Sequence, residues 1–201
     1  MALKNLEELK FVDANPEEME IHMLETVERL LKRKLKQADP LRLFLLSMEA
    51  LQIQQRLLFD KMAKMNVLAY ATGSYLDHIG VLVGTERLPA SSATVTMRLT
   101  LSATREQAII IPKDARVTAG DNIYFALNEN AIIPAGELSV IALASCTESG
   151  VQGNGYLPRE INKIVDPVPF WAAAENITKS EGGADIEDDE SYRERIHEAP
   201  E

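Results

Sequence analysis

Several groups of residues in this chain have types and spacings that could support chemistry. Gly150, Gly153 and Gly155 could form a phosphate-binding loop, and the acidic run at 185–190 could bind calcium. Histidines could bind a metal ion, and they stand at His22, His78 and His197. Serines could serve as nucleophiles, and the candidates are Ser91, Ser92, Ser102, Ser145 and Ser149.

None of these groups has the neighbours that its chemistry requires. The glycine order is not G-x-G-x-x-G, and no lysine or predicted helix follows it. An EF-hand loop needs glycine at its sixth position, where the acidic run has Glu190. The histidines lie in separate parts of the chain, and no serine lies in a G-x-S-x-G sequence. We therefore expect no enzyme activity, cofactor, metal or small-molecule substrate.

Composition and charge also limit the classes of partner. The 201 residues are 46% hydrophobic and 26% charged, which is typical of a globular protein. The net charge of −10 is concentrated at residues 181–201, which contain nine acidic and two basic residues. The remainder has no basic surface for nucleic acid. No segment is apolar enough for a signal peptide or a membrane span, so we expect synthesis in the cytoplasm. The single Cys146 cannot form an internal disulfide.

Two caps that contain proline predict a pair of N-terminal helices. Asn15 and Asp39 each precede a proline, which suits the first position of a helix. We expect helices over 16–37 and 40–65, joined as an antiparallel hairpin. The basic cluster at 32–36 would then lie in the last turns of the first helix, where cations favour the helix dipole, rather than form a polyanion site. A shorter helix is expected over 74–80.

The second helix has an apolar heptad seam. Its members recur at alternating steps of three and four residues: Leu41, Phe44, Met48, Leu51, Gln55, Leu58, Met62 and Met65. Gln55 could set the register of a helix pair or lie at the edge of the stripe, and we favour the edge. Further apolar residues lie off the seam, so one partner helix cannot cover both faces. We expect the seam to contact another chain, although it could pack on the rest of this one.

Downstream, the period changes to that of β-strands. Apolar and polar residues alternate over 94–101, and short apolar runs at 108–111, 123–127, 131–133 and 138–144 are separated by turn signals. The sequence Ile-Ile-Pro occurs twice, at 110–112 and 132–134. These runs predict a β-rich domain over 84–178.

The predicted fold class is α+β, with three parts. A helical region over 1–83 contains the hairpin, a small β-rich domain follows, and a further domain that contains helix starts at 179. This third part rests on residues 181–196, where a glycine pair precedes an acidic helix start. We expect the third domain to be truncated at residue 201.

Six short motifs resemble, in order, those of the baseplate J-like proteins of contractile-tailed phages. They lie at residues 71–77, 84–87, 111–112, 133–136, 150–154 and 182–196. The resemblance extends from about residue 65 to the end of the chain. It implies a non-enzymatic structural subunit of the baseplate wedge, located in the tail baseplate of a phage, prophage or bacteriocin. Its partners would be other wedge subunits, with self-association possible, and in the family the N-terminal helices bundle with neighbouring subunits.

Two other functions stay open at this point. A receptor-binding or adhesin-like tail module is the first alternative, but aromatic residues are only 5% of the chain and a charged helical hairpin leads it. A tail-associated cell-wall hydrolase is the second, and it would need a catalytic acid that no pair of residues here suggests.

Overall fold

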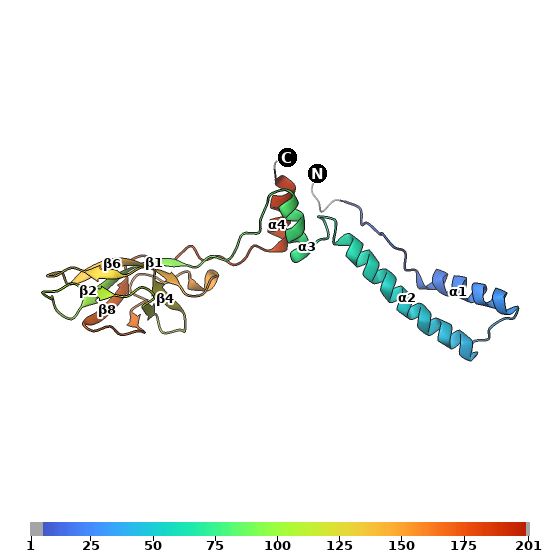
Figure 1. Cartoon of the computed structure of the whole chain (residues 1–201), viewed down its shortest axis with the longest axis horizontal. Helices are drawn as coiled ribbons and strands as arrows, with labels where there is room; N and C mark the ends of the chain where they lie inside the picture. The colour runs from blue at the N-terminus through green and yellow to red at the C-terminus, as the bar shows by residue number, and fades with distance from the viewer. Residues whose placement is uncertain (1–5, 200–201) are drawn as a thin grey trace. The chain divides into compact units, whose positions relative to one another are not determined.

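The computed structural model describes residues 6–199, which fold into two units (Figure 1). The helical unit contains the chain up to Glu86 and again from Asp189, and the β unit contains Arg87–Asp188. The sequence placed the residues from 179 onward at the start of a separate domain. In the structure, the last helix packs within the helical unit, so the chain returns to that unit after the strands. Residues 1–5 and 200–201 lie outside the described part.

Helices α1 (Pro16–Leu31) and α2 (Pro40–Lys64) form the predicted antiparallel hairpin (Figure 1). Both expected caps are present. The Asn15 side chain accepts a hydrogen bond from the main-chain N–H of Glu17, and Asp39 accepts one from that of Leu41.

The predicted end of the first helix at residue 37 is wrong, because α1 stops at Leu31. Lys32 adopts the left-handed conformation, with φ of 52°, and its N–H bonds back to the Glu28 carbonyl. The Glu28 carboxylate then accepts hydrogen bonds from Lys34 Nζ (2.7 Å) and the Leu35 N–H (2.8 Å). Most of the basic cluster therefore lies in a loop rather than in the last turn of a helix.

An extended N-terminal segment runs along the C-terminal half of α2, which the sequence did not predict. Asp60 accepts hydrogen bonds from the main-chain N–H groups of Phe11 (2.7 Å) and Val12 (3.1 Å). Arg56 donates to the carbonyl of Asp13 at 2.9 Å. Polar side chains of α2 thus hold this stretch of main chain, together with the Tyr70 hydroxyl, which accepts the Leu9 N–H at 2.8 Å.

Helices α3 (Ser74–Leu82) and α4 (Asp189–Glu198) pack against each other in the same unit. Their small core contains Ala71, Leu76, Tyr192 and Ile196. The Tyr192 hydroxyl donates to the Thr85 carbonyl at 2.7 Å.

The β unit is a nearly closed antiparallel sheet. Its six strands have the order β7-β3-β4-β6-β1-β8, and the edge strands β7 and β8 contact each other. Their bounds are β1 (Thr94–Leu101), β3 (Arg116–Thr118), β4 (Tyr124–Leu127), β6 (Ser139–Cys146), β7 (Lys163–Ile164) and β8 (Trp171–Asn176). Contact between the edges leaves little edge exposed, as in a barrel.

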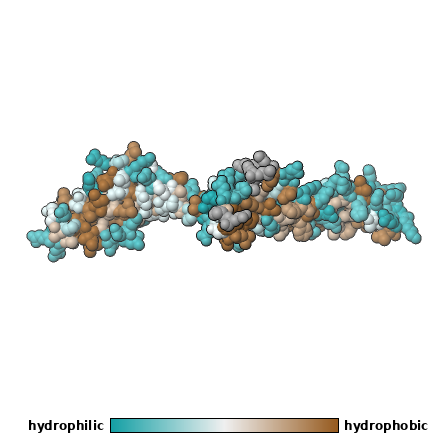
Figure 2. Space-filling model, turned by 90° about the horizontal axis from the view of Figure 1, so that it is seen from above, coloured by the Kyte–Doolittle hydropathy of each residue, from teal (hydrophilic) through white to brown (hydrophobic). Residues whose placement is uncertain are grey.

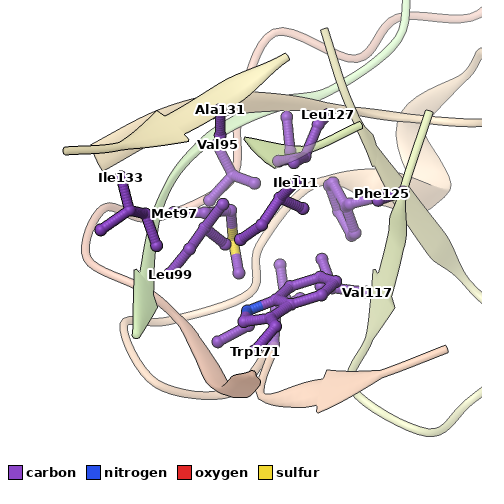
Figure 3. Packing of buried hydrophobic residues seen from close by; sticks show 14 of the residues in the cluster. Val95, Met97, Leu99, Ile111, Val117, Phe125, Leu127, Ala131, Ile133 and Trp171 are labelled. Carbon is purple, nitrogen blue, oxygen red and sulfur yellow. The ribbon is translucent and has the colours of Figure 1, made fainter. Parts of the chain in front are cut away.

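A second ribbon pairs β2 (Ile109–Ile111) with β5 (Ala131–Ile133). The two Ile-Ile-Pro sequences therefore lie on paired strands, with Ile110 opposite Ile132. Both of these residues are exposed, whereas Ile111 and Ile133 point into the core (Figure 3).

One apolar core fills the β unit (Figure 3). Alternate residues of β1 enter it, namely Val95, Met97 and Leu99, as the alternation of the sequence predicted. Phe125 and Trp171 add aromatic surface from β4 and β8. The combination of helical unit and nearly closed sheet confirms the predicted α+β class.

The buried side-chain amide of Asn176 binds main chain of the connection between β6 and β8. Asn176 is 0% exposed, and its side chain accepts from the Ile161 N–H (2.9 Å) while donating to the carbonyls of Leu157 (2.9 Å) and Thr178 (2.8 Å). The Asn176 amide therefore gives these three main-chain groups the hydrogen bonds that a neighbouring strand or helix would otherwise provide.

We expect Asn176→Leu to destabilise the β unit by about 3 kcal/mol, because it leaves three main-chain groups without their partner. Urea denaturation followed by tryptophan fluorescence measures this through Trp171. The control is Asn162→Leu, at an exposed residue with a single side-chain bond to the Arg159 carbonyl. Equal stability of the two variants would contradict the prediction.

Candidate assembly interface

The glycines and carboxylates that could have bound a ligand contact each other instead. Gly150 has φ of 120°, and a Cβ atom there would lie 2.7 Å from Asp185 Oδ1. The same Asp185 oxygen accepts the Val151 N–H at 3.1 Å. At Gly153 a Cβ atom would lie 2.8 Å from the Cβ of Cys146. Gly150 and Gly153 therefore permit close packing against side chains, whereas a Cβ atom at Gly155 would meet open space.

Other members of the acidic run serve as hydrogen-bond acceptors for main chain. Glu187 accepts the Leu88 N–H and Asp189 accepts that of Gly73, both at 3.0 Å. Within residues 6–199, no three histidine, cysteine or acidic side chains are placed to hold a metal ion.

The predicted histidine and serine candidates are also not assembled into a site. His22, His78 and His197 are exposed on α1, α3 and α4. Ser91 donates to the Gly182 carbonyl at 2.8 Å, and Ser92 lies 3.2 Å from Ser149 between their hydroxyl oxygens. These contacts join segments of the β unit.

Motifs that are far apart in the sequence meet in space. Arg193 donates to the carbonyls of Leu68 (2.9 Å) and Ala71 (2.8 Å), across more than 120 positions of the chain. Gly80 allows Tyr192 to approach α3, since a Cβ atom there would lie 1.9 Å from the Tyr192 hydroxyl oxygen and 2.6 Å from the Thr85 carbonyl oxygen. The motif residues near 71–87 and 182–196 thus form packing contacts.

We expect Gly80→Ala to destabilise the contact between α3 and α4 by about 1–3 kcal/mol, through overpacking. Hydrogen exchange of the α3 main-chain amides measures this locally. Tyr192→Phe removes the nearer clashing atom, so the double variant should lose less stability than the sum of the single variants. Strict additivity would show that the two side chains do not compete for this space.

The predicted seam lies on the outward side of α2. Residues of α2 that are covered, such as Leu45, Glu49 and Ile53, lie on another face of the helix. Six of the eight seam residues are exposed, namely Phe44, Met48, Leu51, Gln55, Leu58 and Met62. Leu41 and Met65, at the two ends, are half-buried. The contact of α1 with α2 therefore leaves the seam open.

The exposed fractions show how little of this surface the chain covers. They are 59% for Phe44, 54% for Leu51 and 55% for Leu58. Figure 2 shows hydrophobic residues on the surface of the hairpin among hydrophilic ones. An apolar helix face of this length is usually buried in the functional state of a protein.

The seam extends further round the helix than the heptad pattern indicated. Leu57 and Phe59 flank Leu58 and are 57% and 60% exposed. Phe59 was missed because it falls outside the heptad positions. The signal that could have found it is the run of three consecutive apolar residues at 57–59, which cannot all face one partner helix.

The covered face of α2 contains one buried carboxyl group. Glu49 is 5% exposed and makes no hydrogen bond or ion pair among the described residues. Nearby, Arg42 pairs with Glu20 at 2.9 Å. Burial raises the pKa of Glu49, and the charge of Glu20 raises it further. Both effects make the charged form of Glu49 less favourable in the folded hairpin than in the unfolded chain.

We expect Glu49→Gln to raise the unfolding midpoint of the helical unit at pH 7, since it removes a buried charge. A raised folded-state pKa means that stability is lost as the pH rises through it. The difference in unfolding midpoint between the variant and the wild type should therefore become smaller as the pH falls to about 4, where carboxyls protonate. Thermal melts followed by helical circular dichroism test this, with Glu25→Gln on the exposed side of α1 as control. A gap that is independent of pH would refute the assignment.

A hollow of the helical unit is lined by charged side chains. One open hollow of about 600 Å³ at the hairpin tip is lined by Glu25, Glu28, Arg29, Lys32, Arg33 and Lys34. Arg33 is paired with Asp39, and Lys34 is paired with Glu28.

Among residues 6–199, no helix combines the length and apolar character that a membrane crossing needs.

Comparisons with known proteins agree with this arrangement. Residues 39–94 match the Baseplate J-like N-terminal domain, and residues 96–183 match the Baseplate J-like protein barrel domain. The first match begins at the cap of α2, and the second covers most of the nearly closed sheet. A comparison with curated proteins finds no match.

A similar solved structure is the anti-feeding prophage baseplate, determined by cryo-EM with sixfold symmetrisation. The identity is 13% and the TM-score is 0.46, and the similarity covers 89% of this chain and 50% of that chain. The chain thus spans about half the length of that relative. The two domain matches together cover well over half of the chain, which therefore belongs to the baseplate J-like family of phage-tail baseplate proteins.

Proposed function

We propose that this protein is a wedge subunit of a contractile-tail baseplate and that it joins other wedge subunits through the outward face of α2. The observation that carries the proposal is the exposed apolar seam on a helix whose other face α1 already covers. In this role the protein acts by assembly and not by catalysis. It would be made in the host cytoplasm and reside in the tail baseplate.

Apolar residues at heptad steps suit a partner that is itself helical. Side chains three and four residues apart form a continuous stripe along a helix, and a second helix can insert its own side chains between them. The stripe extends over the 25 residues of α2. A flat or globular partner would not require this regular spacing.

The middle of this surface contains a single charged residue, Arg56. Exposed residues between positions 47 and 59, other than Arg56, are all uncharged: Ser47, Met48, Ala50, Leu51, Gln52, Gln54, Gln55, Leu57, Leu58 and Phe59. Arg56 is occupied by its bond to the Asp13 carbonyl. Depletion of charged residues is typical of the buried centre of a protein interface. A helix meant to face water would have charged residues here.

Gln55 gives the seam one polar position near its centre. Its exposure places it on the open face rather than against α1. Although Gln55 is near the middle of the seam's length, we propose that it lies at the lateral edge of the helix contact, where its amide keeps contact with water. A bundle with a partner helix explains this arrangement, and self-association of two copies through the same face is the other form it could take.

We expect the double variant Leu51→Glu and Leu58→Glu to lose association with the baseplate while remaining folded. Burial of a leucine contributes about 1.5–3 kcal/mol, so the loss of two should weaken association by at least about a hundredfold. Both positions are exposed, so stability should change by no more than about 0.5 kcal/mol for each substitution. The measurement is the fraction of tagged protein recovered in purified tail particles from the producing bacterium.

The matched control is Gln37→Glu, which adds a negative charge to an exposed position in the loop between α1 and α2, outside the seam and outside the uncharged stretch. It should enter particles as the wild type does. Sedimentation of the purified chain separates the two kinds of partner, because only self-association changes its mass. Recovery of the double variant in tail particles at the wild-type level would contradict the proposed interface.

A further inference from the structure

An arginine in the β unit has an aromatic partner but no polar one. The guanidinium of Arg105 lies over the ring of Phe170, with 3.9 Å between the central carbon and the ring centroid. The Arg105 Nε is buried and has no hydrogen-bond partner. No ion pair from Arg105 to another described residue is present either.

The other arginines of the β unit are all occupied within residues 6–199. Arg98 pairs with Glu175 (3.0 Å), and Arg116 pairs with Asp166 (2.8 Å). Arg159 also reaches Glu175, and Arg87 donates to the Glu187 carbonyl at 2.7 Å. Arg105 is the exception, although this unit has an excess of acidic residues. Glu106 is adjacent to it in the chain, and Glu137 follows Gly136, whose N–H bonds to the Arg105 carbonyl. Neither carboxylate pairs with the guanidinium.

Phe170 stands where the backbone favours glycine. A hydrogen bond from the Trp171 N–H to the Val168 carbonyl (3.1 Å) closes a four-residue turn, and Phe170 at its third position has φ of 72°. A positive φ at this position is normally adopted by glycine or asparagine. The turn closed by Glu137 and Pro134 obeys this rule, with Gly136 at the third position and φ of 83°.

A bulky residue in the left-handed region is strained, and strain of this kind collects at functional sites. Among residues 6–199, four other non-glycine residues have positive φ: Lys32, Asp114, Asn122 and Arg159. Phe170 is the only aromatic one, and its ring is half-exposed rather than buried in the core. Folding therefore does not account for a phenylalanine at this turn, whereas the contact with Arg105 does.

Main-chain bonds hold both members of the pair in place. The Arg105 carbonyl accepts the Gly136 N–H at 2.8 Å, and the Phe170 carbonyl accepts the Ser102 N–H at 3.0 Å. The ring restricts the guanidinium plane, so less freedom is lost when a ligand binds. Because Nε is buried, the two terminal nitrogens of the planar guanidinium are the donors that can meet the two oxygens of a carboxylate.

We propose that Arg105, stacked on Phe170, binds a carboxylate group of another protein. Charge favours this ligand over a polyphosphate, because residues 87–188 contain thirteen acidic and eight basic residues and would repel a nucleic acid backbone. A single carboxylate needs only one cation. The site is in the β unit and does not depend on the proposed role of α2.

The test is NMR of the purified chain with ¹⁵N-labelled arginine, observing the Nε–Hε resonance of Arg105. The probes are N-acetylglutamic acid α-amide, which offers a side-chain carboxylate, and N-acetylglycine, which offers a C-terminal one. N-acetylglutamine amide is the neutral control, and inorganic phosphate tests the other anion. We expect a saturable shift at Arg105 with one or both carboxylate probes, which identifies the source, and no shift with the neutral control.

Phe170→Gly relieves the backbone strain but removes the ring, so it should fold and bind the carboxylate probe at least about fivefold more weakly. Phe170→Asn, which also tolerates positive φ, gives the same comparison if the glycine variant does not fold. Arg98, already paired, serves as the internal reference resonance. The proposal is overturned if Arg105 shifts no more than Arg98, if phosphate binds as tightly as the carboxylates, or if the Phe170 variants bind as the wild type does. None of these outcomes bears on incorporation into tail particles, which tests α2 separately.

Discussion

Helix α2 has more apolar surface than its own chain covers. Its inner face packs on α1 and is bordered by the N-terminal segment, and its outer face exposes Phe44, Leu51 and Leu58 to solvent. A helix that is apolar on two sides usually has both sides buried against partners. Much of the remaining structure of the helical unit can be understood from this constraint. Polar contacts such as Asp60 with Phe11 and Arg56 with Asp13 are concentrated on the inner side and leave the outer side free.

In the β unit the groups that need partners are the sheet edges and the polar groups of the connections. Contact between β7 and β8 leaves little sheet edge exposed, and the connections around the sheet are held by buried polar groups. Asn176 binds three main-chain groups, while Gly150 permits Asp185 to reach the Val151 N–H. Residues that resembled ligand sites in the sequence are therefore part of the packing. The exception is Arg105, whose polar groups are left without partners in an otherwise satisfied unit.

Local signals in the sequence predicted most elements correctly. The Asn15 and Asp39 caps marked the starts of α1 and α2, and alternation over 94–101 predicted β1. The end of α1 was missed because Lys32 takes a left-handed conformation that glycine normally signals. Strands β3, β7 and β8 were missed because they are short or follow prolines. Their pairing depends on partners distant in the chain, which local patterns do not contain.

The sequence by itself determined that α2 has a heptad seam, that the fold is α+β and that the motifs are those of the baseplate J-like family. It did not determine which side of α2 the first helix would cover, because both sides are apolar and periodicity alone does not distinguish them. Nor did it show that Tyr192 packs on Gly80 or that Arg105 lies on Phe170. These contacts join residues 65 to 112 positions apart, so only the tertiary structure decides them. The seam became a candidate interface when the fold left it exposed.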